Sequence, residues 1–566
     1  MDNQRLLIWA FFLLMCWMTY QTWVQDFGPQ PVAPAETQPA LTVDETAAPA
    51  IDDDLPELGA QPAAVPEVPA AGSLEPAAVT AAPSIVVRTD VFEVEIASDG
   101  GTLRRAVLLN YPVAKDRPDE LVNLLDTVPP ALGLIESGIR AAAAAAEATH
   151  LSTFESERDS YELGDADALV VPLTWTDASG ITVEKRYRFE RGSYRIDLEQ
   201  IVTNGSGETW RGADYVRIKR HSAEIERSMF DVESYSFIGP IIYDGEKSDK
   251  LDRDDLIDDG TFEYYSQQGW IGSIQHHFVR AAVPPAGDDY RFSVAVNGNI
   301  ATSSAIRRNV VSVAPGTSET FPTTLFVGPK LQSQLEEIDK SLKLTVDYGW
   351  LTIISQPLFW LLSFVHDYVA NWGLAIIVVT ILIKLAFYKL TESSGRSMAR
   401  MRNLQPRMKA LQDRYKDDRQ ALSQAMMDLY KREKVNPAAG CLPILIQMPF
   451  FLAFYWVLLE SVEMRQAPFA LWITDLSTRD PYFILPLIMG VSMFLQQKLN
   501  PAPTDPVQAK VMQIMPVMFT VFFAFFPSGL VLYWVTNTVL SIAQQWKINR
   551  VVEAEAKAQK GGKKTG

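Results

Sequence analysis

The chain has 566 residues, a formal net charge of -17 and a mean hydropathy of +0.01. This length is too great for a single core and predicts several domains. The acidic excess comes from the front part of the chain and argues against a nucleic-acid-binding protein. Cys16 and Cys441 lie far apart, and the five histidines have no zinc-type spacing, so we expect no disulfide, metal site or cofactor. His276 and His277 are expected on the surface of a strand or loop.

Residues 1–24 are expected to form a membrane anchor. The apolar run Leu6–Val24 follows Arg5, exceeds the ~7–15-residue core of a cleavable signal, and has no good cleavage site directly after it. Residues 25–84 are rich in proline, alanine and acidic side chains and contain no basic residue, which predicts a disordered linker. Because segments on the translocated side of a span are poor in Lys and Arg, we expect the linker outside and the N-terminus inside.

Residues 85–330 show a two-residue period. Apolar and polar side chains alternate in Phe92–Ile96, in Ile181–Phe189 and in Phe292–Val296, and the last run ends at an Asn297-Gly298 turn signal. Such alternation between short turns predicts one large antiparallel β domain of the sandwich type.

This β region contains no recognisable catalytic constellation. It has no G-x-S-x-G or Cys–His motif, and its acidic residues are scattered as on solvated faces, so we predict that the protein is not an enzyme. The run Ala141–Ala146 is expected to be a helical or disordered insertion. A hidden carbohydrate pocket stays open, so a membrane-anchored carbohydrate-binding or carbohydrate-active protein is one alternative.

A connecting region follows at residues 331–370. Gln334–Ser341 has the composition of a polar helix, and Asp347–Ala370 is apolar and tryptophan-rich but interrupted by Pro357 and by His366-Asp367. Tryptophan is enriched at membrane–water interfaces. The second segment is therefore predicted to be an amphipathic helix lying on the outer leaflet.

Residues 371–390 are the expected second span, and they carry Lys384. A span needs about 20 apolar residues, and a charge within it costs at least ~2.5 kcal/mol on insertion scales. Thr380 lies one helical turn before Lys384, so both side chains point the same way. The ammonium either snorkels to the headgroups or faces a polar cavity, and its position alone does not separate these alternatives.

Residues 391–436 are the expected cytoplasmic helical hairpin. Basic side chains outnumber acidic ones here, which favours the cytoplasmic side. Apolar residues spaced by three and four on both sides of Lys416–Arg419 predict two antiparallel helices with a coiled-coil-like seam. Pro406 should kink or restart the first helix. The seam residues are Met401, Leu404, Met408, Leu411, Tyr415, Leu422, Met426 and Leu429.

Four further spans are expected at residues 442–462, 482–499, 511–526 and 529–546, and a basic cytoplasmic tail at 547–566. Six transmembrane helices with both chain ends inside satisfy the charge of every loop. Amides interrupt these spans, and such buried groups need partners or water. The amides are Gln447, Gln496, Gln497, Gln513, Asn537, Gln544 and Gln545.

Together with Lys384, these amides indicate a partly hydrated concavity in the inner half of the membrane, although ordinary helix packing held by polar groups gives the same pattern. Walker motifs are absent, which argues against a primary pump. No pair of matching interrupted helices is evident, which weakens the alternative of a solute transporter without excluding it. A cation in such a groove could instead receive an acidic unfolded segment while the apolar part of that segment moves into lipid.

Three blocks closely resemble the YidC membrane protein insertase family of the Gram-negative type, with its Oxa and Albino relatives. They are Asn436–Tyr455 (NPAAGCLPILIQMPFFLAFY), Val462–Pro486 and Phe526–Trp534 (FPSGLVLYW). The resemblance implies a periplasmic β-supersandwich, a cytoplasmic helical hairpin and a five-helix insertase core in the inner membrane, with a hydrophilic groove. It also implies an insertase and chaperone whose partners are nascent membrane proteins, the ribosome, the Sec translocon with its accessory subunits, and the lipid bilayer.

Carried over by position, the candidate groove residues are Lys384, Thr380, Gln447, Met448, Tyr533 and Trp534. Lys384 stands where bacterial members usually have arginine. Lysine keeps the charge but lacks the bidentate fork of a guanidinium. Lys389, where proline is common, is a second departure from the family pattern and is expected to snorkel to the interface. No catalytic residue can be matched.

Overall fold

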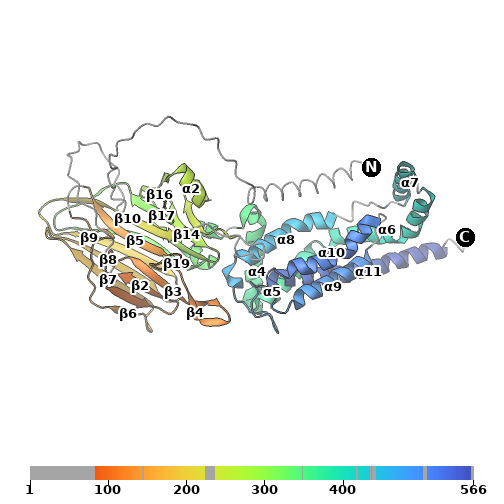
Figure 1. Ribbon diagram of the computed structural model, residues 1–566, viewed down its shortest axis with the longest axis horizontal. Coiled ribbons are helices and arrows are strands. Elements are labelled where there is room, and N and C mark those ends of the chain that lie inside the picture. Colours follow the sequence, from red (N-terminus) through yellow and green to blue (C-terminus); the bar gives the residue numbers. More distant parts are fainter. Residues whose placement is uncertain are drawn as a thin grey trace, which may run out of the picture.

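The computed structural model describes residues 83–142, 146–222, 236–346, 348–415, 418–433, 435, 442–500 and 506–562. The expected anchor, nearly all of the expected linker, and residues 436–441 of the first family-like block lie outside the described residues. Figure 1 shows two bodies in contact, a β domain and a bundle of helices.

The β domain consists of two sheets. The first has the strand order β13-β16-β17-β10-β5-β3-β2-β1-β6, with β18 beside β10 and β4 beside β3, and the second has the order β12-β11-β14-β15-β19-β9-β8-β7. Strand neighbours run antiparallel, except that β1 and β6 are parallel. This arrangement is the sandwich that the sequence predicts.

The strands of the first sheet are β1 (Ser84–Arg88), β2 (Phe92–Ala97), β3 (Leu103–Ala114), β4 (Arg117–Asn123), β5 (Gly133–Ala141), β6 (Ser160–Glu162), β10 (Trp210–His221), β13 (Phe262–Ser266), β16 (Tyr290–Asn297), β17 (Ile300–Arg307) and β18 (Val311–Val313). The strands of the second sheet are β7 (Ala168–Thr176), β8 (Ile181–Glu190), β9 (Arg195–Asn204), β11 (Gly239–Tyr243), β12 (Ser248–Lys250), β14 (Trp270–Gln275), β15 (Phe278–Val283) and β19 (Ser318–Pro329). A short helix, α2 (Arg253–Asp259), lies between β12 and β13.

The predicted alternation holds along these strands. In β8, the exposed Arg186 and Arg188 alternate with the buried Tyr187 and Phe189, as a strand with one face on a core requires. β16 ends at the expected turn, where Gly298 has a φ of 58°, a conformation that glycine adopts without steric cost. Ala141 is the last residue of β5, and residues 143–145 of the expected insertion lie outside the described ranges.

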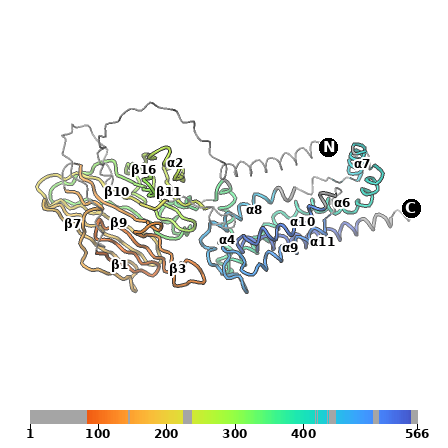
Figure 2. Tube along the Cα trace, viewed as in Figure 1, coloured from red at the N-terminus to blue at the C-terminus, as the bar shows by residue number. Residues whose placement is uncertain are grey.

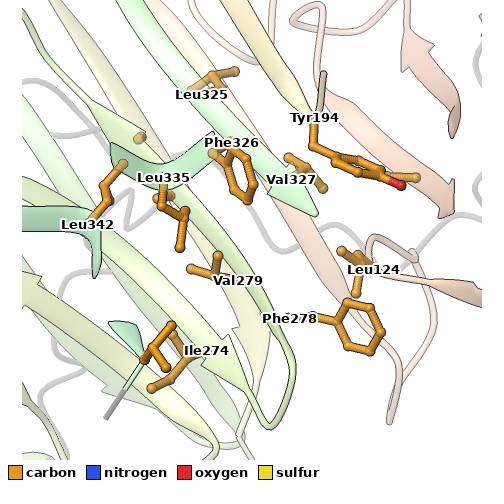
Figure 3. Packing of buried hydrophobic residues seen from close by; sticks show 14 of the residues in the cluster. Leu124, Tyr194, Ile274, Phe278, Val279, Leu325, Phe326, Val327, Leu335 and Leu342 are labelled. Carbon is orange, nitrogen blue, oxygen red and sulfur yellow. The ribbon is translucent and has the colours of Figure 1, made fainter. Parts of the chain in front are cut away.

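Both the strands and the first connecting helix contribute to one apolar core. Figure 3 shows Val279 of β15, Phe326 of β19 and Leu335 of the following helix packed together. Phe326 and Leu335 are fully buried and Val279 nearly so. Burying such a side chain contributes about 1.5–3 kcal/mol, so this layer fixes the connection between the β domain and the helices.

The helical part begins with α3 (Gln332–Ile338) and two 3-10 turns, η2 (Lys340–Thr345) and η3 (Gly349–Leu351). A third turn, η5 (Val462–Met464), follows α8. The bundle and hairpin helices are α4 (Thr352–Val369), α5 (Trp372–Ala386), α6 (Tyr388–Arg414), α7 (Arg419–Arg432), α8 (Leu442–Glu460), α9 (Ile484–Leu499), α10 (Pro506–Phe523) and α11 (Ser528–Gly562). The α6–α7 pair lies at the end of the bundle away from the β domain (Figure 2).

Several helices differ from the expectation. α4 continues through Pro357, and α6 continues through Pro406, so the first hairpin helix does not restart there; a proline removes only one helical hydrogen bond, and packing can offset that loss. α5 ends at Ala386, before the expected 390, and the chain then bends by 69° into α6. The expected tail from residue 547 is not separate, since α11 runs without a break to Gly562.

The β domain and the bundle meet at the end of α8. The Leu459 carbonyl lies 3.0 Å from Nε2 of His276 and 3.1 Å from Nε2 of His277. The prediction that this histidine pair lies on the surface is wrong, since His277 is only 3% exposed. Burial, the neighbouring His276 ring and Lys330 hold the pKa of His277 well below its ordinary value, so this ring is neutral and donates its hydrogen to the carbonyl.

Charged groups complete the junction. The Glu460 carboxylate accepts a hydrogen bond from Ser236 at 3.1 Å and lies 3.9 Å from Nζ of Lys330. Beyond α8, the Arg465 guanidinium donates to the carbonyls of Pro112 and Val113 in β3 at 2.9 and 3.0 Å. The orientation of the β domain on the bundle is therefore set by polar contacts of the α8 end and the loop that follows.

A substitution of Glu463 tests this junction through its pH dependence. Its Oε2 is buried without a hydrogen-bond partner, and burial raises its pKa from 4.5 to about 7. The folded state thus favours the neutral carboxyl, whose contribution to stability is complete below about pH 4.5 and is lost as the pH rises through about 7. We predict that Glu463→Gln stabilises the protein by about 1–3 kcal/mol at pH 8 and has little effect near pH 4.5.

Thermal unfolding of the full chain in detergent at several pH values measures this effect. Glu157→Gln, at an exposed position of the β domain, is the control and should give no pH-dependent difference. A Glu463→Gln effect that is the same at both pH values would contradict the prediction.

Candidate functional site

Lys384 lies in the last turn of α5, and its ammonium donates a 2.7 Å hydrogen bond to Oγ of Ser541 on α11. The Ser541 hydroxyl in turn donates to the carbonyl of Asn537 at 2.7 Å, which aims an oxygen lone pair at the ammonium. No carboxylate in the described part of the chain pairs with Lys384. A neutral group thus orients this half-buried cation, and no described acidic side chain compensates its charge.

Thr380 and Trp534 lie at the same level of the bundle. A Cβ at Gly529 would lie 3.5 Å from Cδ1 of Ile376, and Lys384 meets Ser541 further along, so α5 and α11 run in the same direction. Thr380 and Trp534 fall between these two contacts. Thr380 is only 1% exposed, and its hydroxyl donates to the carbonyl of Ile376 at 2.6 Å, so in this conformation it faces its own helix.

Trp534 and Tyr533 belong to an aromatic cluster between α8, α10 and α11. The Trp534 ring lies 4.7 Å from Phe451 and 5.3 Å from Phe523, and the Tyr533 ring stacks on Phe454 at 4.6 Å. Tyr533 is 5% exposed, whereas Trp534 is half-buried. Tyr533 therefore supports the packing of α11, and Trp534 is the member with an accessible side.

Gln447 and Met448 lie in the first half of α8. Gln447 is half-buried and Met448 is exposed. Phe450, one turn after Gln447, lies 5.1 Å from Phe387 at the bend that ends α5, so this face of α8 lies beside the end of α5. The structure thus places Lys384 at the α5–α11 contact, Thr380 buried on α5, Trp534 on α11 beside α8 and α10, and Gln447 on α8.

A row of polar side chains on α11 continues from Ser541 toward the hairpin. Gln545 donates to Oδ1 of Asn549 at 2.9 Å and to the carbonyl of Gly395 at 3.3 Å, and Asn549 donates to the carbonyl of Leu499 at 3.3 Å. The sequence analysis singled out Gln545 but missed Ser541 and Asn549. Ser541, Gln545 and Asn549 are spaced four residues apart. This spacing places all three on one helix face and could have identified the row from the sequence.

The hairpin helices α6 and α7 pack in antiparallel fashion. Arg407 near the middle of α6 pairs with Glu433 after the end of α7 at 2.6 Å. Tyr415 does not join the apolar seam, because it lies at the end of α6, and Tyr430 packs against the seam instead. The expected seam residues in this cluster are Met401, Leu404, Met408, Leu411, Leu422, Met426 and Leu429.

The outside of the bundle is apolar. Large exposed apolar patches on a protein mark contacts with lipid or with partners. By length and composition, no single described helix suffices to cross a membrane, whereas α5 and α6 taken together as a bent pair pass that test, and α8, α9 and α10 contain shorter apolar helices. The exposed side chains on α9 and α10 are Leu487, Ile488, Val491, Phe494, Leu495, Val511, Ile514, Val517, Met518, Val521 and Phe522.

The β domain has a polar cleft of about 730 Å³ over its first sheet. Glu136, His150 and Lys219 line it, and Lys219 pairs with Glu136 at 3.1 Å. Ligand pockets are mostly apolar and aromatic, but no Trp, Tyr or Phe of the described chain lines this cleft. Within the described ranges, no three His, Cys, Asp or Glu side chains are grouped to hold a metal ion. Neither observation favours the carbohydrate alternative.

A β domain fixed to a helical bundle that exposes many large apolar side chains, with a lysine inside that bundle, fits the class of membrane proteins. Comparisons with known proteins agree with this class. The family model of the 60Kd inner membrane protein matches residues 364–556, and that of the YidC periplasmic domain matches residues 84–361.

Two curated relatives match the chain over nearly its whole length. The membrane protein insertases YidC of Nitrosococcus oceani and of Thioalkalivibrio sulfidiphilus are each 46% identical to it, over 98% of this chain and 100% of theirs. A crystal structure of an active YidC insertase has a TM-score of 0.37 at 18% identity, covering 82% of this chain and 92% of that one; this TM-score is too low to support a statement about the fold.

The chain belongs to the YidC family of membrane protein insertases. The predicted family and activity are confirmed: this is an inner-membrane insertase with a periplasmic β-sandwich domain and a helical core.

A stability measurement tests the placement of Lys384. An ammonium without a counter-charge in an apolar bundle costs free energy. A protein whose function requires such a group is commonly less stable than a variant with an apolar residue at that position. We predict that Lys384→Met raises the stability of the detergent-solubilised protein by about 1–2 kcal/mol, measured as an increase in Tm. Lys498→Met, at an exposed position of α9, is the control, and a lower Tm for Lys384→Met would contradict the prediction.

Proposed function

We propose that Lys384 draws the acidic, translocated part of a nascent membrane protein into the bundle. The observation that carries this proposal is the pairing of its ammonium with the neutral Ser541 and with no carboxylate of the described chain. A carboxylate about 4 Å away would gain about 4 kcal/mol at an effective dielectric constant near 20. A side chain already neutralised by the protein could not offer this attraction.

The neighbouring groups would shape a hydrophilic groove around that contact. Thr380 precedes Lys384 by one turn of α5, Trp534 precedes Ser541 by two turns of α11, and the polar row of α11 extends from Ser541 toward the hairpin. In this proposal Gln447 and Met448 line the α8 side, with Tyr533 holding Trp534 in place. Thr380 would contribute its hydroxyl once its bond to Ile376 opens.

Six transmembrane helices with both chain ends in the cytoplasm fit this arrangement. The β domain and the α6–α7 hairpin lie at opposite ends of the bundle (Figure 1). Since the β domain is periplasmic, a bilayer around the bundle puts the basic hairpin on the cytoplasmic side, in agreement with the charge rule for loops. The exposed apolar side chains of α9 and α10 would then face lipid.

Insertion in this scheme needs no covalent chemistry. Leucine, isoleucine, phenylalanine and valine each favour the membrane by about 0.3–0.6 kcal/mol at the helix centre, and the membrane potential contributes about 2.3 kcal/mol per charge per 100 mV to an acidic tail. Lys384 lowers the free-energy barrier for moving the polar segment of the substrate into the bundle. The hairpin would engage the ribosome or nascent chain, and the protein would act alone or beside the Sec translocon, also as a folding chaperone.

The central prediction concerns the charge at position 384. In proteoliposomes, Lys384→Ala should lower the insertion of a single-span substrate with an acidic translocated tail about tenfold, the equivalent of about 1.4 kcal/mol, while Lys384→Arg should retain most activity because it keeps the charge. Protease protection of the translocated tail measures insertion.

Lys389→Ala, at an exposed position five residues further on, is the matched control and should insert normally. A substrate whose tail carries no acidic residue should depend less on Lys384. Normal insertion of the acidic-tail substrate by Lys384→Ala would remove Lys384 from this mechanism.

A second prediction ranks the domains. Deleting most of residues 85–328 should be tolerated better than deleting residues 401–429, because the proposed substrate path lies in the bundle and hairpin. Complementation of a depletion strain, with membrane levels of each protein checked, measures the ranking. The opposite order would make the β domain central to insertion.

A further inference from the structure

Two arginines cross between the sheets of the periplasmic domain. Arg220 of β10 in the first sheet donates to the carbonyl of Ile274 on β14 of the second sheet at 2.6 Å. Arg280 of β15 in the second sheet reaches Gly133 on β5 of the first. Both guanidiniums donate to one acceptor, Oε1 of Gln275, each at 3.2 Å. Two cations thus share one neutral amide between the sheets.

No acidic group in the described chain balances this pair. The partners of the two guanidiniums are a hydroxyl, a carbonyl and an amide. Arg280 is 4% exposed, and its Nε and Nη1 have no hydrogen-bond partner. Burial and the neighbouring Arg220 hold the pKa of Arg280 well below its ordinary value. Because a guanidinium keeps its proton in proteins, the pair is a buried double charge with no counter-ion among the described residues.

The Gly133 backbone packs directly against the Arg280 guanidinium. A Cβ at Gly133 would lie 3.2 Å from Cζ and 3.3 Å from Nη1 of Arg280, and 3.1 Å from the carbonyl of Leu124. These separations are tighter than ordinary van der Waals contact, so a larger residue would press on the guanidinium. Glycine at this position preserves the donor geometry.

We propose that Arg220 and Arg280 bind a small oxyanion with the chemistry of phosphate. The planar fork of arginine matches the oxygens of phosphate and carboxylate groups, and two positive charges suit a doubly charged ion. Because Arg280 is only 4% exposed, a small ion suits this position better than a large anionic ligand. Free phosphate and the phosphate of an anionic lipid headgroup share this chemistry, and the experiment below separates them.

The site adjoins the contact between the periplasmic domain and the bundle. Gln275, the shared acceptor, immediately precedes His276 and His277, whose rings hydrogen-bond to Leu459 at the end of α8. An anion that fixes Gln275 through the two arginines would therefore also stiffen this junction. The proposal assigns the periplasmic domain a binding site that is separate from the Lys384 groove.

The test uses the full-length protein in a neutral maltoside detergent. Sodium phosphate is titrated at constant ionic strength, with binding measured by calorimetry and stability by thermal unfolding. We expect saturable binding and a Tm increase of about 5 °C at about 100 times the Kd. Arg280→Gln and Arg220→Gln should each weaken binding at least about tenfold, the loss of one charged hydrogen-bond donor. Gly133→Ala, which keeps both charges, should also weaken binding.

Arg211→Gln, at an exposed position of the same strand β10, is the matched control and should bind like the parent. Without phosphate, Arg280→Gln should melt at the same or a higher temperature than the parent, since it removes an unbalanced charge, so lost binding cannot be attributed to misfolding. A lower melting temperature for Arg280→Gln under this condition would contradict the proposal. Equal stabilisation by sodium chloride, or equal loss of binding in Arg211→Gln, would also overturn it.

Nanodiscs distinguish the source of the phosphate group. The protein is compared in phosphatidylglycerol and phosphatidylcholine nanodiscs in phosphate-free buffer. Stabilisation by phosphatidylglycerol that Arg280→Gln abolishes would support the site with a lipid headgroup as its ligand. Stabilisation by free phosphate alone would support a soluble ion, and no arginine-dependent effect of either probe would overturn the proposal.

Discussion

The helical core depends on one constraint, which is the placement of an ammonium among apolar helices. Lys384 is tolerated because Ser541 accepts its hydrogen bond and because α11 continues as a polar row against α5 and α6. A neighbouring side chain of α11 holds the bend after Ala386 in place. Gln544 donates a 2.8 Å hydrogen bond to Oγ1 of Thr391, just beyond the bend. A neutral partner orients the cation but does not neutralise it. Apolar packing alone could fix the helices, but it would leave nothing to attract a charged segment.

At the contact between the two bodies, three buried titratable groups instead have their charge neutralised or removed. His277 is held neutral by burial, the buried Glu463 carboxyl has a raised pKa, and Glu460 lies beside Lys330. A buried polar group that loses its partner costs free energy. Each of these contacts therefore favours the one orientation of the β domain on the bundle in which the partners meet. The periplasmic domain is thereby attached at the end of α8 rather than tethered only by the chain.

The sequence predicts the structural elements whose apolar residues repeat at a regular spacing. The β2, β8 and β16 strands and the hairpin seam were found because their apolar residues repeat at two, or at three and four, positions. The burial of His276 and His277 could not be found in this way, because the partner Leu459 is far away in the chain. Tyr533 was assigned to the groove from family position, but its ring packs on Phe454. The number of spans and the groove itself stay predictions.

The uninterrupted α11 has a mechanical consequence. Its 35 residues correspond to a length of about 52 Å, well beyond the roughly 30 Å of a bilayer's hydrocarbon layer. In the orientation proposed above, about 20 Å of this helix would extend past the membrane on the hairpin side, and no helix break separates Ser541 from Gly562. In the proposed function, a nascent chain that displaces this end of α11 would also displace Ser541, the hydrogen-bond partner of Lys384, so the continuous helix would couple a contact outside the membrane to the interior of the bundle.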